Sequence, residues 1–482
     1  MNRNNRRSGF PKIATCLLGG AVLAVGMAIV LNSCGGDQFS RTYLDKYVET
    51  VDMEVAKSKA LKPGTAVYVD FSDGMNHAYT TETSQNALRS VVNAFTGVSG
   101  ETKFYSLADS KITPLNETQT GIYNAIMSGA NYTKTMAPIE ETLKTIVNNR
   151  QAALLITDFE EYNNGVIQRQ NYAKDYFISW LSEGYNIIFY KIDYSEKGAQ
   201  KHLYFTVFDS PESNLSAEVE KALGSYVGKG VDKFVLAGTC FNFAGATSYL
   251  SSTQGGNYHN GDGEDIVTAV MEGGTDEAFK NYTLSAFSPF AEYYPFGVDW
   301  KNINENIKAT QEEGMPEGDK FTHLLSKFYV DFDMQNGYTI NGVAADVVNF
   351  EPAIQQIITA TDYVGVFNNP ANLPEAKPVL DMFTVSMAPA KLDKLPGHNW
   401  TEIFVDLDQR FQGELPSGMN TVNDLLKIDV VIADATPRLD GIESFFAWPG
   451  NTSLSESVKN TILSDKVNPK GRAIITYFVK VM

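Results

Sequence analysis

Residues 151–159, QAALLITDF, constrain the fold of this 482-residue chain more than any other segment. The run is apolar without interruption until Asp158, which is typical of a strand covered on both faces. TAVYVDF at 65–71 has the same texture and also meets an acidic residue near its end, Asp70. Strands of this kind occur in sheets that carry helices on both sides, so we expect an α/β fold.

Helix-like and strand-like segments alternate from residue 61 to residue 240. Strands separated by helices of about ten to fifteen residues predict a mostly parallel sheet flanked by helices. We therefore expect one α/β domain over 61–240. Apolar residues recur at helical spacing in four segments that define this pattern, 81–95, 117–129, 137–149 and 172–184.

Residues 241–482 have a different pattern. Strand-like runs are separated by polar turns, and Asn336-Gly337 is a typical hairpin signal. Helical segments are fewer, with 352–363 and 455–465 the clearest. The sequence therefore predicts that a β-rich α+β domain follows the α/β domain.

The first 33 residues have the pattern of a secretory signal that ends in a lipobox. Basic residues precede an apolar stretch over 13–31, and Leu31-Asn32-Ser33 leads to Cys34. This predicts a lipoprotein acylated on Cys34 with a tether over 34–60. A transmembrane anchor is the alternative, because the apolar stretch is nearly long enough to span a bilayer. Since Asp does not follow Cys34 directly, the pattern favours the outer membrane, facing either the periplasm or the outside.

The chain is acidic and poor in cysteine. It has 57 Asp and Glu against 39 Lys and Arg, a net charge of −18, which disfavours nucleic acid as a partner. Cys16 lies in the signal and Cys34 is the predicted lipidation site, so Cys240 is left without a disulfide partner. We expect Cys240 to be a buried apolar residue, with a reactive thiol as the alternative.

Acidic and hydroxyl residues follow the two buried strands. Asp70 and Ser72 come at the end of the first strand, Asp158 ends the second, and Thr133 lies between them in sequence. The carboxyl ends of parallel strands meet at one edge of a sheet, where ligands gather. Carboxylate and hydroxyl oxygens suit a hard cation such as Mg²⁺. The alternative needs no metal, because an Asp at a strand end can accept hydrogen bonds from nearby N–H groups.

Three short segments, DFSDG at 70–74, TKT at 133–135 and TDFE at 157–160, resemble the metal-ion-dependent adhesion site of the von Willebrand factor A family. That site has Asp-x-Ser-x-Ser, then a Thr, then Thr-Asp-Gly, and the resemblance covers roughly residues 61–210. It implies that a divalent ion, Mg²⁺ or Mn²⁺, takes an acidic residue of a protein partner as its last ligand. The ligands it implies are Asp70, Ser72, Thr133 and Asp158.

The chain departs from the family pattern at several positions. Gly74 stands where the family has the second Ser, Phe159 replaces the Gly of Thr-Asp-Gly, and no Gly-Gly precedes the middle Thr. Asp73 is a candidate to replace the missing Ser, and Thr135 could take the place of Thr133. These departures leave open a metal-free form of the same fold.

Other sequence features indicate weaker alternatives. Haloacid dehalogenase phosphatases also place an Asp after a first strand, but their second Asp would be Ser72 here, which removes the general acid. No other nucleophile or phosphate-binding motif was found, so we do not expect an enzyme. Residues 255–266 have the chemistry of a Ca²⁺ loop or of an exposed polar loop. The aromatic run at 287–296 fits a glycan-binding or protein-binding face, or ordinary core packing.

The sequence as a whole predicts a lipid-anchored binding protein of the cell envelope. Its von Willebrand A-like domain would engage a protein partner through a divalent metal. The alternative is a metal-free scaffold that meets a glycan or another envelope protein through the C-terminal domain. Sensitivity of partner binding to EDTA separates the two.

Overall fold

A computed structural model places part of the chain. The predicted signal, Cys34, the tether, Cys240 and the candidate calcium loop lie outside the described residues, and the aromatic run is described only from residue 292. The described residues are 61–97, 102–163, 166–167, 171–209, 213–238, 242–243, 267–269, 282–283, 292–298, 326–332, 336–359, 376–391, 399–408, 414–420 and 424–481.

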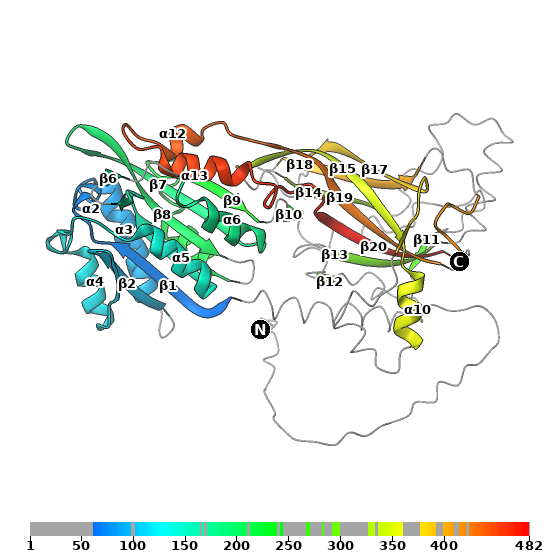
Figure 1. Ribbon diagram of the computed structural model, residues 1–482, viewed down its shortest axis with the longest axis horizontal. Helices are drawn as coiled ribbons and strands as arrows, with labels where there is room; N and C mark the ends of the chain where they lie inside the picture. The colour runs from blue at the N-terminus through cyan, green and yellow to red at the C-terminus, as the bar shows by residue number, and fades with distance from the viewer. Residues whose placement is uncertain are drawn as a thin grey trace, which may run out of the picture. The chain divides into compact units, whose positions relative to one another are not determined.

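Seven strands from the first half of the chain form one sheet (Figure 1). They are β1 (Lys62–Asp70), β2 (Thr102–Ala108), β3 (Lys111–Pro114), β4 (Gln151–Thr157), β7 (Asn186–Glu196), β8 (Ala199–Asp209) and β9 (Asp232–Ala237). Their spatial order is β3-β2-β1-β4-β8-β7-β9. A separate small hairpin consists of β5 (Tyr162–Asn163) and β6 (Val166–Ile167).

This sheet is mixed. β1 pairs in parallel with β2 and β4, whereas the outer pairs, from β3 to β2 and from β4 through β8 and β7 to β9, are antiparallel. β7 and β8 form a hairpin because only Lys197 and Gly198 connect them, and both residues have the positive φ of a tight hairpin turn. The α/β class is confirmed, and the antiparallel pairs are a feature that the helix–strand alternation did not predict.

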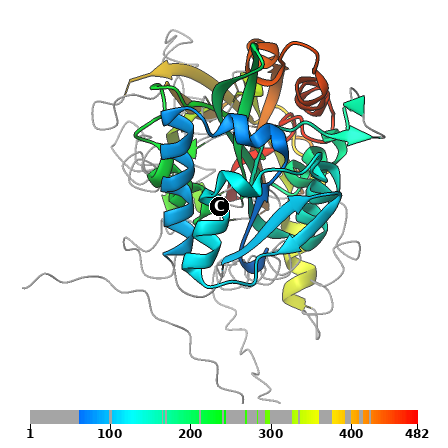
Figure 2. The ribbon, with the colours of Figure 1, turned by 90° about the vertical axis from the view of Figure 1, so that its left-hand side faces the viewer.

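Helices cover both faces of the sheet. They are α2 (Asp73–Ala78), α3 (Glu82–Thr96), α4 (Gln119–Met127), the 3-10 turn η1 (Gly129–Asn131), α5 (Ile139–Asn149), α6 (Lys174–Ser182) and α7 (Leu215–Leu223). Successive side chains of a strand point to opposite faces. Val67 and Val69 therefore pack with α2, α3, α4 and α7, while Tyr68 packs with α5 and α6. Figure 2 shows α2, α3 and α4 as the neighbouring blue and cyan helices.

The C-terminal region is β-rich, as the sequence predicts. One antiparallel sheet has the order β10 (Asn242–Phe243), β14 (Ser326–Asp331), β18 (Trp400–Leu407) and β17 (Phe383–Ala390). The other has the order β11 (Val267–Ala269), β13 (Glu292–Val298), β20 (Ala473–Val481), β19 (Leu425–Pro437), β15 (Tyr338–Asn349) and β16 (Lys377–Pro378), with β12 (Tyr282–Thr283) beside β13. Only β13 and β20 pair in parallel among the described strands of this second sheet. Helix α10 (Glu351–Thr359) directly follows β15.

Two late helices, α12 (Ile442–Phe446) and α13 (Ser453–Ile462), pack against the α/β sheet and its helices. The ring of Phe446 lies 4.9 Å from that of Phe189 on β7, and Ser457 Oγ accepts a hydrogen bond of 3.3 Å from Ala173 N at the start of α6. Residues far beyond the predicted boundary at 240 thus complete this core.

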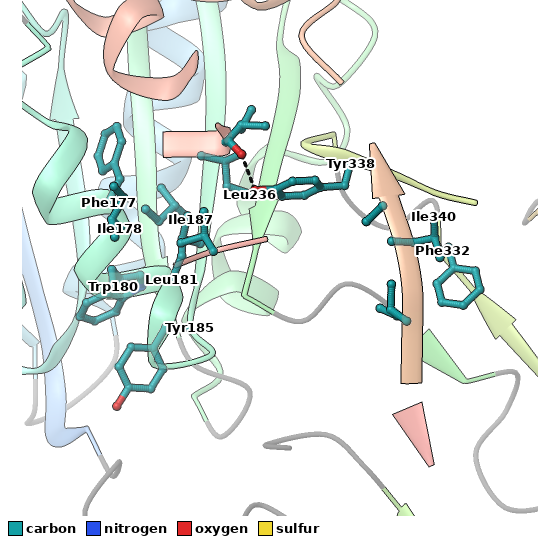
Figure 3. Close-up of a cluster of buried hydrophobic side chains, with 14 of the residues drawn as sticks. Phe177, Ile178, Trp180, Leu181, Tyr185, Ile187, Leu236, Phe332, Tyr338 and Ile340 are labelled. Carbon is teal, nitrogen blue, oxygen red and sulfur yellow. Dashed lines mark hydrogen bonds between the residues drawn. The ribbon is translucent and has the colours of Figure 1, made fainter. Parts of the chain in front are cut away.

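Figure 3 shows part of the same apolar cluster. Phe177, Trp180 and Leu181 of α6 lie close to Ile187 of β7, and the Tyr338 hydroxyl donates a hydrogen bond of 2.5 Å to Ile462 O of α13. The end of α13 is therefore tied to the first residue of β15. No helix among the described residues has both the length and the apolar character needed to cross a bilayer.

Candidate functional site

The predicted acidic pair meets at one edge of the sheet. Asp70 is the last residue of β1, and Asp158 directly follows β4. Because β1 and β4 are parallel with Val69 opposite Ile156, both acids emerge at the same end of adjacent strands. Asp70 is 1% exposed and Asp158 is 2% exposed. The sheet therefore holds two carboxyl groups inside the protein at its carboxyl edge.

The Asp70 carboxylate is held by its neighbours. Its Oδ1 accepts a hydrogen bond of 2.7 Å from Ser72 N, and its Oδ2 accepts one of 2.8 Å from Thr157 Oγ1. Thr157 Oγ1 in turn accepts from Phe159 N at 3.2 Å. These contacts fix the two strand ends to each other, and they are the contacts that a strand-ending Asp makes without any metal.

Asp158 faces the start of α2. Its Oδ1 accepts from Glu160 N at 3.0 Å, and its Oδ2 accepts from the Tyr194 hydroxyl at 3.3 Å. A Cβ atom built on Gly74 would lie 3.2 Å from Asp158 Oδ2. Gly74 thus allows the start of α2 to approach this carboxylate closely, in the position where the resemblance has a Ser.

The middle loop lies beside the first one. Asp73 N donates to Lys134 O at 2.7 Å, and Lys134 N donates to Phe71 O at 3.4 Å. This bridge places Thr133 next to the 71–73 segment, with its side chain exposed. No hydrogen bond joins the Thr133 side chain to any group in the described part of the chain. The four predicted ligands are thus on adjacent segments, and their joint binding of a metal stays a prediction.

Phe159 adopts an unusual backbone conformation for a bulky residue. Its φ is +58°, in the left-handed region that glycine favours. The side chain is 0% exposed, and its ring lies 5.6 Å from that of Tyr204 and 6.3 Å from that of Phe189. The turn after Asp158 therefore has the backbone geometry of a glycine turn, while the side chain at this position packs into the core.

The surroundings of Asp70 and Asp158 disfavour the ionised form of both carboxyl groups. Burial raises the pKa of Asp70. Burial also raises the pKa of Asp158 well above its usual range, and the negative charges of Glu160 and Asp70 raise it further. Without a cation beside them, both carboxyl groups bind protons more readily than an exposed Asp.

A third acid, Glu160, already has a cationic partner. Its Oε1 lies 2.8 Å from Lys201 Nζ, which also lies 2.5 Å from Glu196 Oε2. Trp448 Nε1, from the segment after α12, donates to the same Glu160 Oε1 at 3.3 Å. Lys201 is therefore shared between two glutamates and leaves the Asp70 and Asp158 pair without a cation in direct contact among the described residues.

Three residues near the acidic pair were not predicted from the sequence: Tyr194, Lys201 and Trp448. Successive residues of a strand point to opposite faces of the sheet, so the pattern of β7 could have predicted that Tyr194 points into the protein. Lys201 and Trp448 carry no local signal, because they reach Glu160 from other parts of the chain. The described residues contain no group of three or more His, Cys, Asp and Glu side chains that could hold a metal ion.

Asp70 and Asp158 supply only two carboxylates, so this site suits a cation that needs few carboxylate ligands from the protein. Each ionised carboxylate has about four acceptor positions, and hydrogen bonds use one position on each oxygen of Asp70 and Asp158. Two carboxylates with hydroxyl groups and water suit Mg²⁺ or Mn²⁺ better than zinc, which prefers nitrogen and sulfur ligands. Comparisons with protein-family models, with curated proteins and with solved structures found no match.

Proposed function

We propose that this chain is a lipid-anchored binding protein of the cell envelope, whose α/β domain engages an acidic protein partner through Mg²⁺ or Mn²⁺. The ligands are Asp70, Ser72, Thr133 and Asp158, as the resemblance to the von Willebrand factor A family implies. One observation carries the proposal: two buried acids with raised pKa values lie at the carboxyl edge of the sheet, beside the 133–135 loop.

The chain's own residues have separate roles in this proposal. Thr157 and the Ser72 amide orient Asp70, while Tyr194 and the Glu160 amide orient Asp158. A bound divalent ion neutralises both carboxylates and offers its remaining positions to water or to a partner carboxylate. Ser72 and Thr133 would contribute neutral oxygens, so the two carboxylates would balance the charge of the ion without exceeding it.

The test uses Mn²⁺ and an acidic peptide. Water-proton relaxation of the full-length chain with Mn²⁺ reports water molecules that remain on the bound ion. We expect a Glu-containing peptide to lower this relaxation by displacing water, and the same peptide with Gln in place of Glu to have no effect. Equal effects of the two peptides, or none from either, would contradict the proposed recognition of an acidic partner.

The metal-free scaffold is the second candidate, and a specific observation favours it. Every oxygen of Asp70 and Asp158 already accepts a hydrogen bond from the protein. Such a site can serve only to join β1, β4 and α2. In that case EDTA leaves partner binding unchanged, and the interaction resides in the β-rich C-terminal region.

A further inference from the structure

A cavity of about 450 Å³ lies between α2, α3, α4 and η1, and neither Asp70 nor Asp158 lines it. Its volume is within the range of about 300–1,000 Å³ that small-molecule sites occupy. Beneath the lining lie Leu88, Ile126 and Tyr132, none of them more than 1% exposed. Its rim is polar and exposed, with Asn76, Gln85 and Arg89 around the opening.

Polar groups around this cavity have unused hydrogen-bonding capacity. Tyr79 also lines the cavity, but its hydroxyl is buried beneath the surface, where no hydrogen-bond partner lies among the described residues. The side-chain amides of Asn76 and Gln85 make none within the described part of the chain. Gly129 lets the Asn76 amide lie close above the backbone, since a Cβ there would be 3.2 Å from Asn76 Oδ1. The exposed amides of Asn76 and Gln85 are therefore available to a ligand.

The charge of the lining favours an anion. Arg89 is the cation of the lining, and none of the lining residues is acidic, although acidic residues outnumber basic ones in the whole chain. The Arg89 guanidinium has Asn86 Oδ1, at 3.5 Å, as its hydrogen-bond partner and forms no ion pair within the described residues. A guanidinium binds carboxylates with two parallel hydrogen bonds. A zwitterion is disfavoured, because no acid is present to pair with its ammonium group.

We propose that this cavity binds a small hydroxylated carboxylate of the size of a sugar acid. Arg89 binds the carboxylate. The side-chain amides of Asn76 and Gln85 pair with the hydroxyl groups of the ligand, because amides and hydroxyls can each donate and accept hydrogen bonds. This proposal does not rest on the metal site proposed at Asp70 and Asp158, because neither residue lines the cavity.

The test is a calorimetric titration of the full-length chain with D-glucuronate, D-galacturonate, D-glucose and acetate at millimolar concentrations. We expect saturable binding of at least one of the two uronates and much weaker binding of glucose and acetate. Arg89→Gln is expected to weaken uronate binding by about tenfold or more, because it removes charge-assisted hydrogen bonds. Asn76→Ala is expected to weaken it by a smaller factor.

Lys221→Gln is the matched control, because it removes one exposed positive charge from α7 on the same face of the sheet. It should leave uronate binding unchanged. The proposal is overturned if neither uronate binds, if glucose binds as tightly as the uronates, or if Arg89→Gln and Lys221→Gln have equal effects. Unfolding midpoints of all variants distinguish a lost contact from a lost fold.

Discussion

At the scale of single residues, Phe159 holds a backbone conformation that glycine usually adopts. A non-glycine residue in the left-handed region costs about 1–2 kcal/mol. Burial of the ring against Tyr204 and Phe189 offsets this cost. The resemblance to the von Willebrand factor A pattern implies Gly at position 159, but the positive φ of Phe159 and the packing of its ring are evident only in the structure.

Two substitutions test this conformation. Phe159→Ala and Phe159→Gly both remove the buried ring, which costs about 3–5 kcal/mol. Only glycine relieves the left-handed backbone, so we expect Phe159→Gly to be the more stable of the two by about 1 kcal/mol. Urea unfolding of both variants measures the difference. If the alanine variant is the more stable one, residue 159 does not have a positive φ.

Glu161 is predicted to make stability depend on pH. Its Oε2 accepts from Glu140 N, at the start of α5, at 2.8 Å. Burial, more than the negative charges of Glu140 and Asp70, raises the pKa of Glu161 from 4.5 to about 7. The folded state then holds the proton more tightly than the unfolded state. The resulting stabilisation is complete below about pH 4.5 and is lost as the pH rises through about 7.

Glu161→Gln removes this titration while keeping an oxygen that can accept from Glu140 N. We expect the variant to gain stability relative to the native chain as the pH rises between about 4.5 and about 7. Urea unfolding at a series of pH values measures this gain. A stability difference that is constant across that range would contradict the raised pKa.

At the scale of elements, α13 supplies the hydrogen-bond acceptor for the backbone N–H at the start of α6. The N-cap residue of α6 is Ala173, which has no side-chain oxygen to cap the helix. Instead Ser457 Oγ of α13 accepts from Ala173 N. The Thr461 hydroxyl donates at 2.7 Å to Ser457 O within α13 and lies 3.5 Å from Lys174 O. The two helices thus depend on each other although nearly three hundred residues separate them in sequence.

Ser457→Ala tests this dependence. It leaves the buried Ala173 N without an acceptor, so we expect a loss of about 1–3 kcal/mol in the free energy of unfolding. Ser182→Ala, at an exposed position near the end of α6, should change it by less than about 0.5 kcal/mol. Comparable effects of the two substitutions on urea unfolding would show that the Ser457 contact has no special role.

At the scale of the whole molecule, local sequence patterns predicted the helices and strands better than they predicted which elements pack together. The segments 81–95 and 137–149 correspond to α3 and α5 within two residues, since amphipathic spacing is a local property. The parallel pairing of β1 with β4 followed from their apolar runs, and with it the common edge of Asp70 and Asp158. The packing of α12 and α13 on this core could not be predicted, because nothing in residues 442–462 indicates which surface they cover.

The packing of these late helices makes a prediction about truncation. A fragment ending at residue 240 lacks Phe446, whose ring packs against that of Phe189. It also lacks the Phe445 carbonyl, which accepts a hydrogen bond of 2.7 Å from the Tyr204 hydroxyl. We expect residues 61–240 alone to bind a hydrophobic dye and to lack a cooperative unfolding transition. Cooperative unfolding of the fragment with the midpoint of the full chain would contradict this role of α12 and α13.

The most direct test of a metal site at Asp70 and Asp158 is calorimetric titration of Mg²⁺ and Mn²⁺ into the full-length chain. The comparison is with Asp70→Asn/Asp158→Asn, and the control is Asp175→Asn/Glu218→Gln, which removes two exposed acids elsewhere in the same domain. We expect saturable binding in the native chain and the control, and none in the Asp70 and Asp158 variant. Absence of binding to the native chain, or binding that survives in that variant, would contradict a metal centre at the edge of this sheet.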